Sequence, residues 1–242
     1  MTKEAYEDDI FILRVEDWQT ADKYAVCFSR NHGKIAFLAF GARYPKNTFG
    51  RLVQPFAQLH AHFTPGRRLE TLRQCENIVV PKPLDIQTLA YGAVIAECVE
   101  QLTSEQEKQE EIYALLLQGV DLLHKHNKRL VTLSVLCKLL VLCGFAPELD
   151  CCTSCGQPLA ADGFFSLAQG GFMCHECAVD QELSCSVETA KLLRLLRDLD
   201  LAAPGEFKVR GGALMEVERI LVKFITYQTD RPLKSLEFLA QI

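Results

Sequence analysis

The sequence predicts an α+β fold in which a small strand-rich domain precedes a helical domain, with a four-cysteine zinc module embedded in the helical part. Three observations predict this class. The first 80 residues contain short β-rich runs between turn signals. From residue 81 onward, apolar residues recur at spacings of three and four, and two Cys-x-x-Cys pairs interrupt that pattern. The expected divisions are residues 1–80, 81–149, 150–182 and 183–242, of which the second and fourth form the helical domain.

Composition sets the broad class. A length of 242 residues with 49 % hydrophobic residues allows well-filled cores in two or three small domains. The longest apolar stretch, near residues 130–145, is interrupted by Lys138 and is too short to span a bilayer, so we expect no membrane insertion. The opening MTKEAYEDD lacks the pattern of a signal peptide. We therefore expect a cytoplasmic protein with reduced cysteines, most of which act as small core hydrophobes.

The first domain is predicted to be a small barrel or sandwich, because five β-rich runs lie close together in the chain. Turn signals at Asn31-His32-Gly33, Pro45-Lys46-Asn47 and Thr64-Pro65-Gly66 separate several of them. The runs are residues 10–15, 23–29, 34–40, 52–63 and 69–75.

His60 and His62 share one face of the fourth run, while Leu59, Ala61 and Phe63 share the other, as in a half-buried strand. A His-x-His pair could hold a metal ion. The neighbouring sequence offers no third ligand, so solvent-facing histidines are the favoured interpretation.

Helices are predicted for residues 85–102, 105–126, 128–143, 187–199 and about 213–227. Gly144 ends the third helix, and Ser186 caps the fourth. The buried side of that fourth helix is expected to consist of Leu192, Leu193, Leu195, Leu196 and Leu199.

The two cysteine pairs predict one structural zinc ion. Two thiolates three residues apart on a tight turn can face one ion, and two such turns complete a tetrahedron. Gly156 and the Gly170-Gly171 pair suit such turns. Buried or disulfide-bonded cysteines are the alternative, and Cys151 is expected to be a bystander because it lacks the two-residue gap. A zinc ion with four thiolate ligands has no open position for water, so a structural role is expected. The predicted ligands are Cys152, Cys155, Cys174 and Cys177.

Charge is unevenly distributed along the chain, although the formal net charge is −5. Residues 1–22 and the region of the second predicted helix are acidic, whereas residues 23–73 carry a net charge of +8. Such asymmetry is typical of a domain that binds a polyanion, and a solvated basic face is the equal alternative. The basic residues are Lys23, Arg30, Lys34, Arg43, Lys46, Arg51, Arg67, Arg68 and Arg73, against Glu70 alone.

Aromatic residues are interleaved with these cations, which suits single-stranded nucleic acid, because aromatic faces stack on unpaired bases. Phe28 and Phe37 lie within predicted strands and are expected in the core. Tyr44 and Phe49 are better placed, since they lie in the glycine-bounded basic loop GARYPKNTFG, residues 41–50.

Catalytic motifs are absent from the sequence. It has no phosphate-binding Gly-x-x-x-x-Gly-Lys-Ser/Thr loop, no dinucleotide fingerprint and no zinc-deaminase pattern. We expect no enzymatic activity and no small-molecule substrate.

Three segments, in this order, resemble the bacterial recombination mediator family RecO. They are NHGKIAFLAFGARYPKNTFGRLVQPF, PELDCCTSCGQPLAADGFFSLAQGGFMCHEC and the ending PLKSLEFL, and the resemblance extends over essentially the whole chain. It implies an N-terminal OB-fold, a helical domain and a four-cysteine zinc module. It also implies a DNA repair role: binding single- and double-stranded DNA, annealing complementary strands, pairing with RecR, and helping to load RecA onto DNA coated with single-stranded DNA-binding protein. The resemblance further implies that the protein is cytoplasmic and associates with the nucleoid when it is bound to DNA.

The resemblance also implies contact residues. By position, the expected DNA contacts are Arg30, Lys34, Arg43, Lys46 and Arg51, to which the loop adds Tyr44 and the basic segment adds Arg67 and Arg68.

A weaker expectation places the acidic, apolar tail of the single-strand binding protein on Lys128, Arg129 and Lys138. Basic residues that simply face water are the slightly favoured alternative for this helix.

Two other classes of function remain open at this stage. One is a protein-interaction adaptor in which the zinc module and helical domain bind partners and the basic segment is incidental. The other is a metal-dependent hydrolase, which the sequence supports least, because the predicted zinc ligands are all thiolates.

Overall fold

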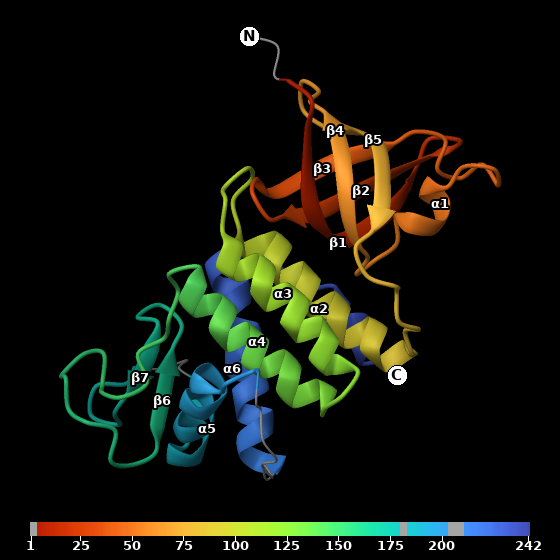
Figure 1. Ribbon diagram of the computed structural model, residues 1–242. Helices are drawn as coiled ribbons and strands as arrows, with labels where there is room; N and C mark the ends of the chain where they lie inside the picture. The colour runs from red at the N-terminus through yellow and green to blue at the C-terminus, as the bar shows by residue number, and fades with distance from the viewer. Residues whose placement is uncertain (1–3, 180–182, 203–210) are drawn as a thin grey trace.

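The computed structural model describes residues 4–179, 183–202 and 211–242 (Figure 1). A β-barrel and a helical domain lie side by side, and a small sheet lies at the end of the helical domain farthest from the barrel (Figure 1). This arrangement confirms the predicted fold class, a barrel followed by a helical region. The last three residues of the predicted module 150–182 lie outside the described residues.

The barrel is closed, with the strand order β1-β2-β3-β5-β4, and is OB-like. All neighbouring strands are antiparallel except β3 and β5. Its elements are β1 (Tyr6–Trp18), β2 (Asp22–Ser29), β3 (Gly33–Ala39), the short helix α1 (Phe49–Leu52), β4 (Gln58–Thr64) and β5 (Glu70–Asn77).

The helical domain is built around α4, which packs against α2, α3, α5 and α6. Side chains cap three of the helices: Asp85, Asn127 and Ser186 accept hydrogen bonds from the first turns of α2, α4 and α5. The predicted Ser186 cap is therefore confirmed. The elements are α2 (Ile86–Leu102), α3 (Glu110–Leu123), α4 (Lys128–Leu142), α5 (Val187–Asp198), α6 (Gly211–Thr229) and α7 (Ser235–Leu239).

Three short strands follow α4 and form a sheet in the order β7-β6-β8. They are β6 (Gly163–Ser166), β7 (Gly171–Met173) and β8 (Leu183–Cys185). Phe165 and Phe172 are buried, and the Phe165 ring meets Phe224 of α6 with centroids 5.4 Å apart. The sheet is thus attached to the helical core by aromatic packing.

Two hydrophobic cores hold the molecule together. One fills the barrel and includes Ile10, Phe37 and Leu59. The other joins the helices to the outer face of the first two strands, where Phe11 and Phe28 are fully buried. Barrel and helical domain therefore share a continuous apolar interface.

The structure corrects three details. The predicted strand 52–63 is wrong before Gln58, because residues 49–52 form α1 and Phe56 adopts φ 67°, which breaks an extended run. The predicted helix 105–126 begins only at Glu110. Leu195, expected in the buried side of its helix, is 46 % exposed, because the buried stripe of α5 runs through Leu192, Leu193 and Leu196.

Candidate nucleic-acid interface and metal centre

The loop from Phe40 to Gly50 is fixed against the turn between β1 and β2. The Arg43 backbone N–H donates to the Ala21 carbonyl at 2.8 Å, and the Gly41 N–H donates to Asp22 Oδ1 at 2.7 Å. From the other side, Lys23 Nζ donates to the carbonyls of Gly50 and Val53. The loop is therefore attached to the barrel on both sides and held in one position.

Exposed aromatic rings and cations gather on this loop. Tyr44 is 62 % exposed and Phe40 is 50 % exposed. Phe49, by contrast, is half-buried against the barrel core, so of the two loop aromatics singled out from the sequence only Tyr44 is fully presented. The exposed basic residues of the loop and of α1 are Arg43, Lys46 and Arg51. We call this set, with Phe40 and Tyr44, the loop surface.

Arg43 is held in place by the neighbouring turn. Its Nη2 lies 3.2 Å from Asp17 Oδ2, and its Nη1 lies 3.5 Å from the Gln19 carbonyl and 3.4 Å from the Thr20 carbonyl. These contacts are long and exposed, so they orient the guanidinium while leaving it accessible.

Trp18, at the end of β1 beside the same turn, is 40 % exposed, and its ring lies 5.8 Å from that of Tyr24. Sequence reasoning missed Trp18, and it counted Phe40 among the aromatic residues interleaved with the cations without singling it out. Each lies at the end of a strand next to a turn, and that position is the sequence signal that could have indicated an exposed ring.

Two of the other expected DNA contacts have partners within the molecule. Lys34 Nζ donates to the carbonyls of Glu100 and Thr103 at 2.5 Å each, and burial lowers the pKa of Lys34. Arg30 donates to Glu110 Oε1 through Nε and Nη2 at 2.9 and 2.8 Å. Both residues tie the barrel to the helical domain.

Arg67 and Arg68 are exposed on the loop between β4 and β5. Figure 1 shows this loop at the upper end of the barrel near the N-terminus, whereas the loop surface and α1 project to the right. The structure thus does not bring these two arginines together with Arg43 and Lys46.

The three cations proposed for a partner on α4 are half-buried and contact other parts of the molecule. Lys128 Nζ lies 3.6 Å from Asp85 Oδ2, and Lys138 Nζ donates to the Arg197 carbonyl at 2.8 Å. Arg129 forms a two-pronged ion pair with Glu218 of α6. Their described contacts stabilise helix packing.

Four thiols converge at the far end of the molecule. The four Sγ atoms of Cys152, Cys155, Cys174 and Cys177 all lie within 4.8 Å of one another. Those of Cys155 and Cys174 are 3.8 Å apart. Zinc–sulfur bonds of about 2.3 Å in a tetrahedron place sulfurs about 3.8 Å apart. The cluster therefore has the dimensions of a tetrathiolate site and could hold a metal ion.

Backbone amides around Cys152 favour the anionic form of its sulfur. Gly156 adopts φ 72° and its N–H donates to the Cys152 carbonyl, which closes the first turn. Burial raises the pKa of Cys152, but hydrogen bonds from the backbone amides of Cys155, Cys174 and Ser154 outweigh it and lower the pKa to about 6. A thiolate is thus favoured at the position nearest the core. The backbone of Cys151 forms an isolated antiparallel β-bridge with Pro158, and its thiol is not part of the cluster.

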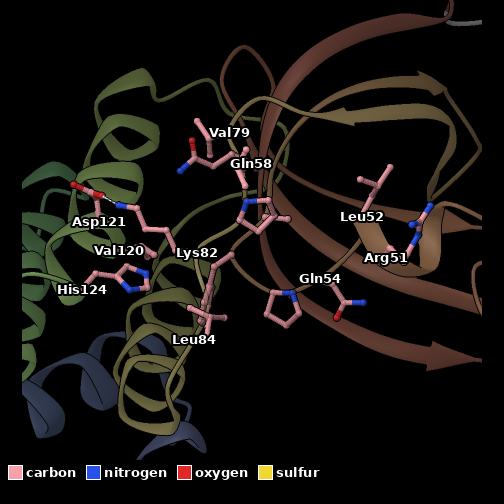
Figure 2. Close-up of a pocket in the computed structure, with 15 residues that line it drawn as sticks. Arg51, Leu52, Gln54, Gln58, Val79, Lys82, Leu84, Val120, Asp121 and His124 are labelled. Atoms are coloured by element: carbon pink, nitrogen blue, oxygen red, sulfur yellow. Dashed lines mark hydrogen bonds and ion pairs between the residues drawn. The ribbon is translucent and has the colours of Figure 1, made fainter.

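A mostly apolar hollow of about 310 Å³ is lined by residues of both the barrel and the helical domain (Figure 2). Leu52 and Gln58 line it from the barrel, and Val120 and His124 line it from α3 and its end. Figure 2 shows Lys82 of the connecting segment reaching Asp121, with which it pairs.

Residues 78–86, which connect β5 to the first residue of α2 and border the hollow, include several exposed apolar side chains. Val80 is 87 % exposed, and four others are between 39 % and 57 % exposed: Ile78, Val79, Leu84 and Ile86.

Comparison with known proteins decides the family. Residues 1–80 match the family described as "Recombination protein O N terminal", and residues 83–237 match "Recombination protein O C terminal". The chain belongs to the RecO family. The resemblance inferred from the three sequence segments is thereby confirmed, and this is a family of DNA repair and recombination proteins.

Relatives named DNA repair protein RecO align over almost the full length. The protein from Symbiobacterium thermophilum is 32 % identical over 97 % of this chain and 96 % of its own length. The one from Pelotomaculum thermopropionicum is 32 % identical over 97 % and 93 %, and the one from Myxococcus xanthus is 30 % identical over 99 % and 98 %. Within the described residues, no helix is both long and apolar enough to cross a membrane.

Proposed function

We propose that this RecO-family chain is a non-enzymatic DNA-binding mediator that acts in the cytoplasm and joins the nucleoid when on DNA. It binds single- and double-stranded DNA, anneals complementary strands and, together with RecR, helps to load RecA onto DNA coated with single-stranded DNA-binding protein. The observation that carries the proposal is the loop surface, where exposed rings and cations lie on a fixed loop of an OB-like barrel.

The chemistry of the loop surface suits an unpaired strand. Arg43, Lys46 and Arg51 can neutralise backbone phosphates, and the rings of Tyr44 and Phe40 can stack on bases. Each stacked base is worth about 1–3 kcal/mol and requires no particular sequence. Binding without sequence preference is what annealing of arbitrary complementary strands needs.

The four-thiol cluster is proposed to hold one zinc ion per chain with a structural role. Thiolates favour zinc over hard cations, and four protein ligands leave no position for a reacting water. In this proposal the cluster fixes the turns around the short sheet and takes no part in DNA contact.

The test is fluorescence-detected annealing of two complementary oligonucleotides, one coated with single-stranded DNA-binding protein, without ATP or added metal. Wild-type protein should accelerate annealing. Arg43→Glu/Lys46→Glu should remove most of the acceleration, because it reverses two charges on the loop surface. The matched control, Lys191→Glu/Lys223→Glu, makes the same charge change on exposed positions of α5 and α6 and should anneal like wild type.

The salt dependence of binding provides the quantitative check. Each phosphate contact contributes about 0.7 to the slope of log affinity against log salt for single strands. The loop variant should therefore lower that slope by about 1.4. Equal slopes and equal annealing in the folded loop variant and the control would refute the role of this surface.

A protein-interaction adaptor is the second candidate, and the exposed apolar segment around Val80 favours it. In that case binding to RecR would persist at salt concentrations that abolish DNA binding, and annealing would not be accelerated.

A further inference from the structure

A second group of metal-binding side chains lies on the outer face of the barrel. Strands β1 and β4 pair so that Glu7 stands opposite His62 and Asp9 stands opposite His60. On β4 the alternating residues Leu59 and Ala61 fill the barrel, which turns both histidines outward. Four chemically suitable side chains, two from each strand, therefore share one patch.

The distances between these groups are close to those of a metal site. Glu7 Oε2 lies 3.5 Å from His62 Nδ1 and 3.9 Å from His60 Nε2, and one ligand atom from each residue lies within 4.8 Å of the others. Ligand bonds of about 2.1 Å place donor atoms about 3.0–3.4 Å apart in octahedral or tetrahedral geometry. Small rotations of these partly exposed side chains would bring the observed separations to the values expected around a bound ion.

Asp9 orients one of the ligands. Its Oδ1 lies 2.8 Å from His60 Nδ1, which leaves Nε2 of the same ring directed toward Glu7. A carboxylate that accepts a hydrogen bond from the second ring nitrogen is the usual outer partner of a metal-bound histidine, because it fixes the tautomer and raises the basicity of the ligand.

The surroundings are acidic on balance and open to solvent. The hollow beside the histidines measures about 470 Å³ and is also lined by Glu76, Arg73 and Thr48. The Arg73 guanidinium donates to Thr64 Oγ1 at 2.9 Å. Around the two histidines, three carboxylates (Glu7, Asp9 and Glu76) therefore outnumber the single guanidinium of Arg73.

We propose that Glu7, His60 and His62 form a second metal site that binds a divalent first-row transition ion such as zinc or nickel. The two imidazole ligands favour this class over calcium or magnesium, and a carboxylate is also a common zinc ligand. The protein supplies three ligands, so water occupies the remaining positions, in contrast to the closed four-thiol cluster. Glu7 is the third ligand that the sequence near the histidines lacks.

The site is tested on the full-length protein already saturated with zinc at the four-thiol cluster, using Co²⁺ as the probe. Isothermal titration calorimetry should show that one Co²⁺ binds per chain in addition to the zinc. The absorption spectrum should show weak cobalt bands typical of nitrogen and oxygen ligands, without the intense ultraviolet band of cobalt bound to sulfur.

Variants identify the ligands. His60→Gln/His62→Gln should lose the second ion, and Asp9→Asn should weaken its binding about 10- to 100-fold. The control is the other His-x-His pair of the chain, changed as His124→Gln/His126→Gln, which should retain full binding. Absence of bound Co²⁺ in the zinc-loaded wild type, retention of Co²⁺ by His60→Gln/His62→Gln, or an equal loss of Co²⁺ in the control would overturn the proposal.

Discussion

At the scale of single residues, Asp8 attaches the start of β1 to the end of β2 and the turn that follows it. Its carboxylate is buried and accepts hydrogen bonds from Ser29 Oγ, from the backbone and side chain of Asn31 at 2.9 and 2.8 Å, and from His32 Nδ1 at 2.8 Å. Burial by itself raises the pKa of Asp8, but these donors outweigh it and lower the pKa below its ordinary value.

Asp8→Asn should therefore lower the free energy of unfolding at pH 7 by about 1–3 kcal/mol. Because the folded state lowers the pKa, the stabilisation is complete above the unfolded value near about 4 and is lost as the pH falls through the folded value. The difference between wild type and Asp8→Asn in urea unfolding should thus shrink at acid pH. Asp17→Asn, at an exposed position, should change stability by less than about 0.5 kcal/mol. A pH-independent difference would contradict the argument.

The residue scale also shows what sequence could and could not predict. The four clustered cysteines follow from local spacing alone, because each pair lies on one turn. Local spacing does not predict the internal partners of Arg30 and Lys34. Arg30 contacts Glu110 and Lys34 contacts Glu100, residues far along the chain that come close only when the barrel packs on the helices. Glu7 beside His62 likewise depends on strand register.

At the scale of elements, the described part of the four-cysteine region consists of two pieces with different support. The turns that carry the cysteines are held by backbone hydrogen bonds, and a metal ion bound by the four thiols would hold them further. Strands β6 and β7 are attached independently, because Phe165 and Phe172 are buried in the core of the helical domain.

Removal of bound metal should therefore loosen the turns more than the strands. After complete chelation, hydrogen–deuterium exchange should rise at residues 151–157 and 174–178, whereas Phe165, Phe172 and α4 keep most of their protection. Peptides from the barrel serve as the internal control. Global loss of protection would show that the ion supports the whole fold, and unchanged exchange at the turns would show that it supports neither piece.

Sequence patterns predicted long elements better than short ones. Helices α2, α4 and α6 follow from their apolar period, whereas β6, β7 and α7 are three to five residues long and give too little pattern to recognise. The failed strand at residues 52–57 has a backbone cause, the positive φ of Phe56 after Pro55, which alternation of side chains does not reveal.

At the scale of the whole molecule, the barrel is tied to the helical domain by polar contacts around a shared apolar interface. Arg14 Nε lies 2.9 and 2.7 Å from the two carboxylate oxygens of Glu100. Lys34 binds the carbonyls of Glu100 and Thr103, at the C-terminal end of α2, where a cation also complements the helix dipole. The position of the loop surface relative to the helices is fixed by these contacts.

A comparison of two lysines separates assembly from DNA contact. Lys34→Met should lower the free energy of unfolding by about 1–3 kcal/mol, because two helix-end carbonyls lose a charged donor, and should change oligonucleotide affinity less than twofold in the folded protein. Lys46→Met, at an exposed loop position, should do the reverse: stability changes by less than about 0.5 kcal/mol, while affinity falls and its salt slope drops by about 0.7. Urea unfolding and fluorescence anisotropy at several salt concentrations measure both quantities. The contradicting outcome is that Lys34→Met weakens DNA binding as much as Lys46→Met does, without destabilising the fold. In that case Lys34 would leave the two carbonyls to bind phosphate, and the two domains would have to move apart on DNA.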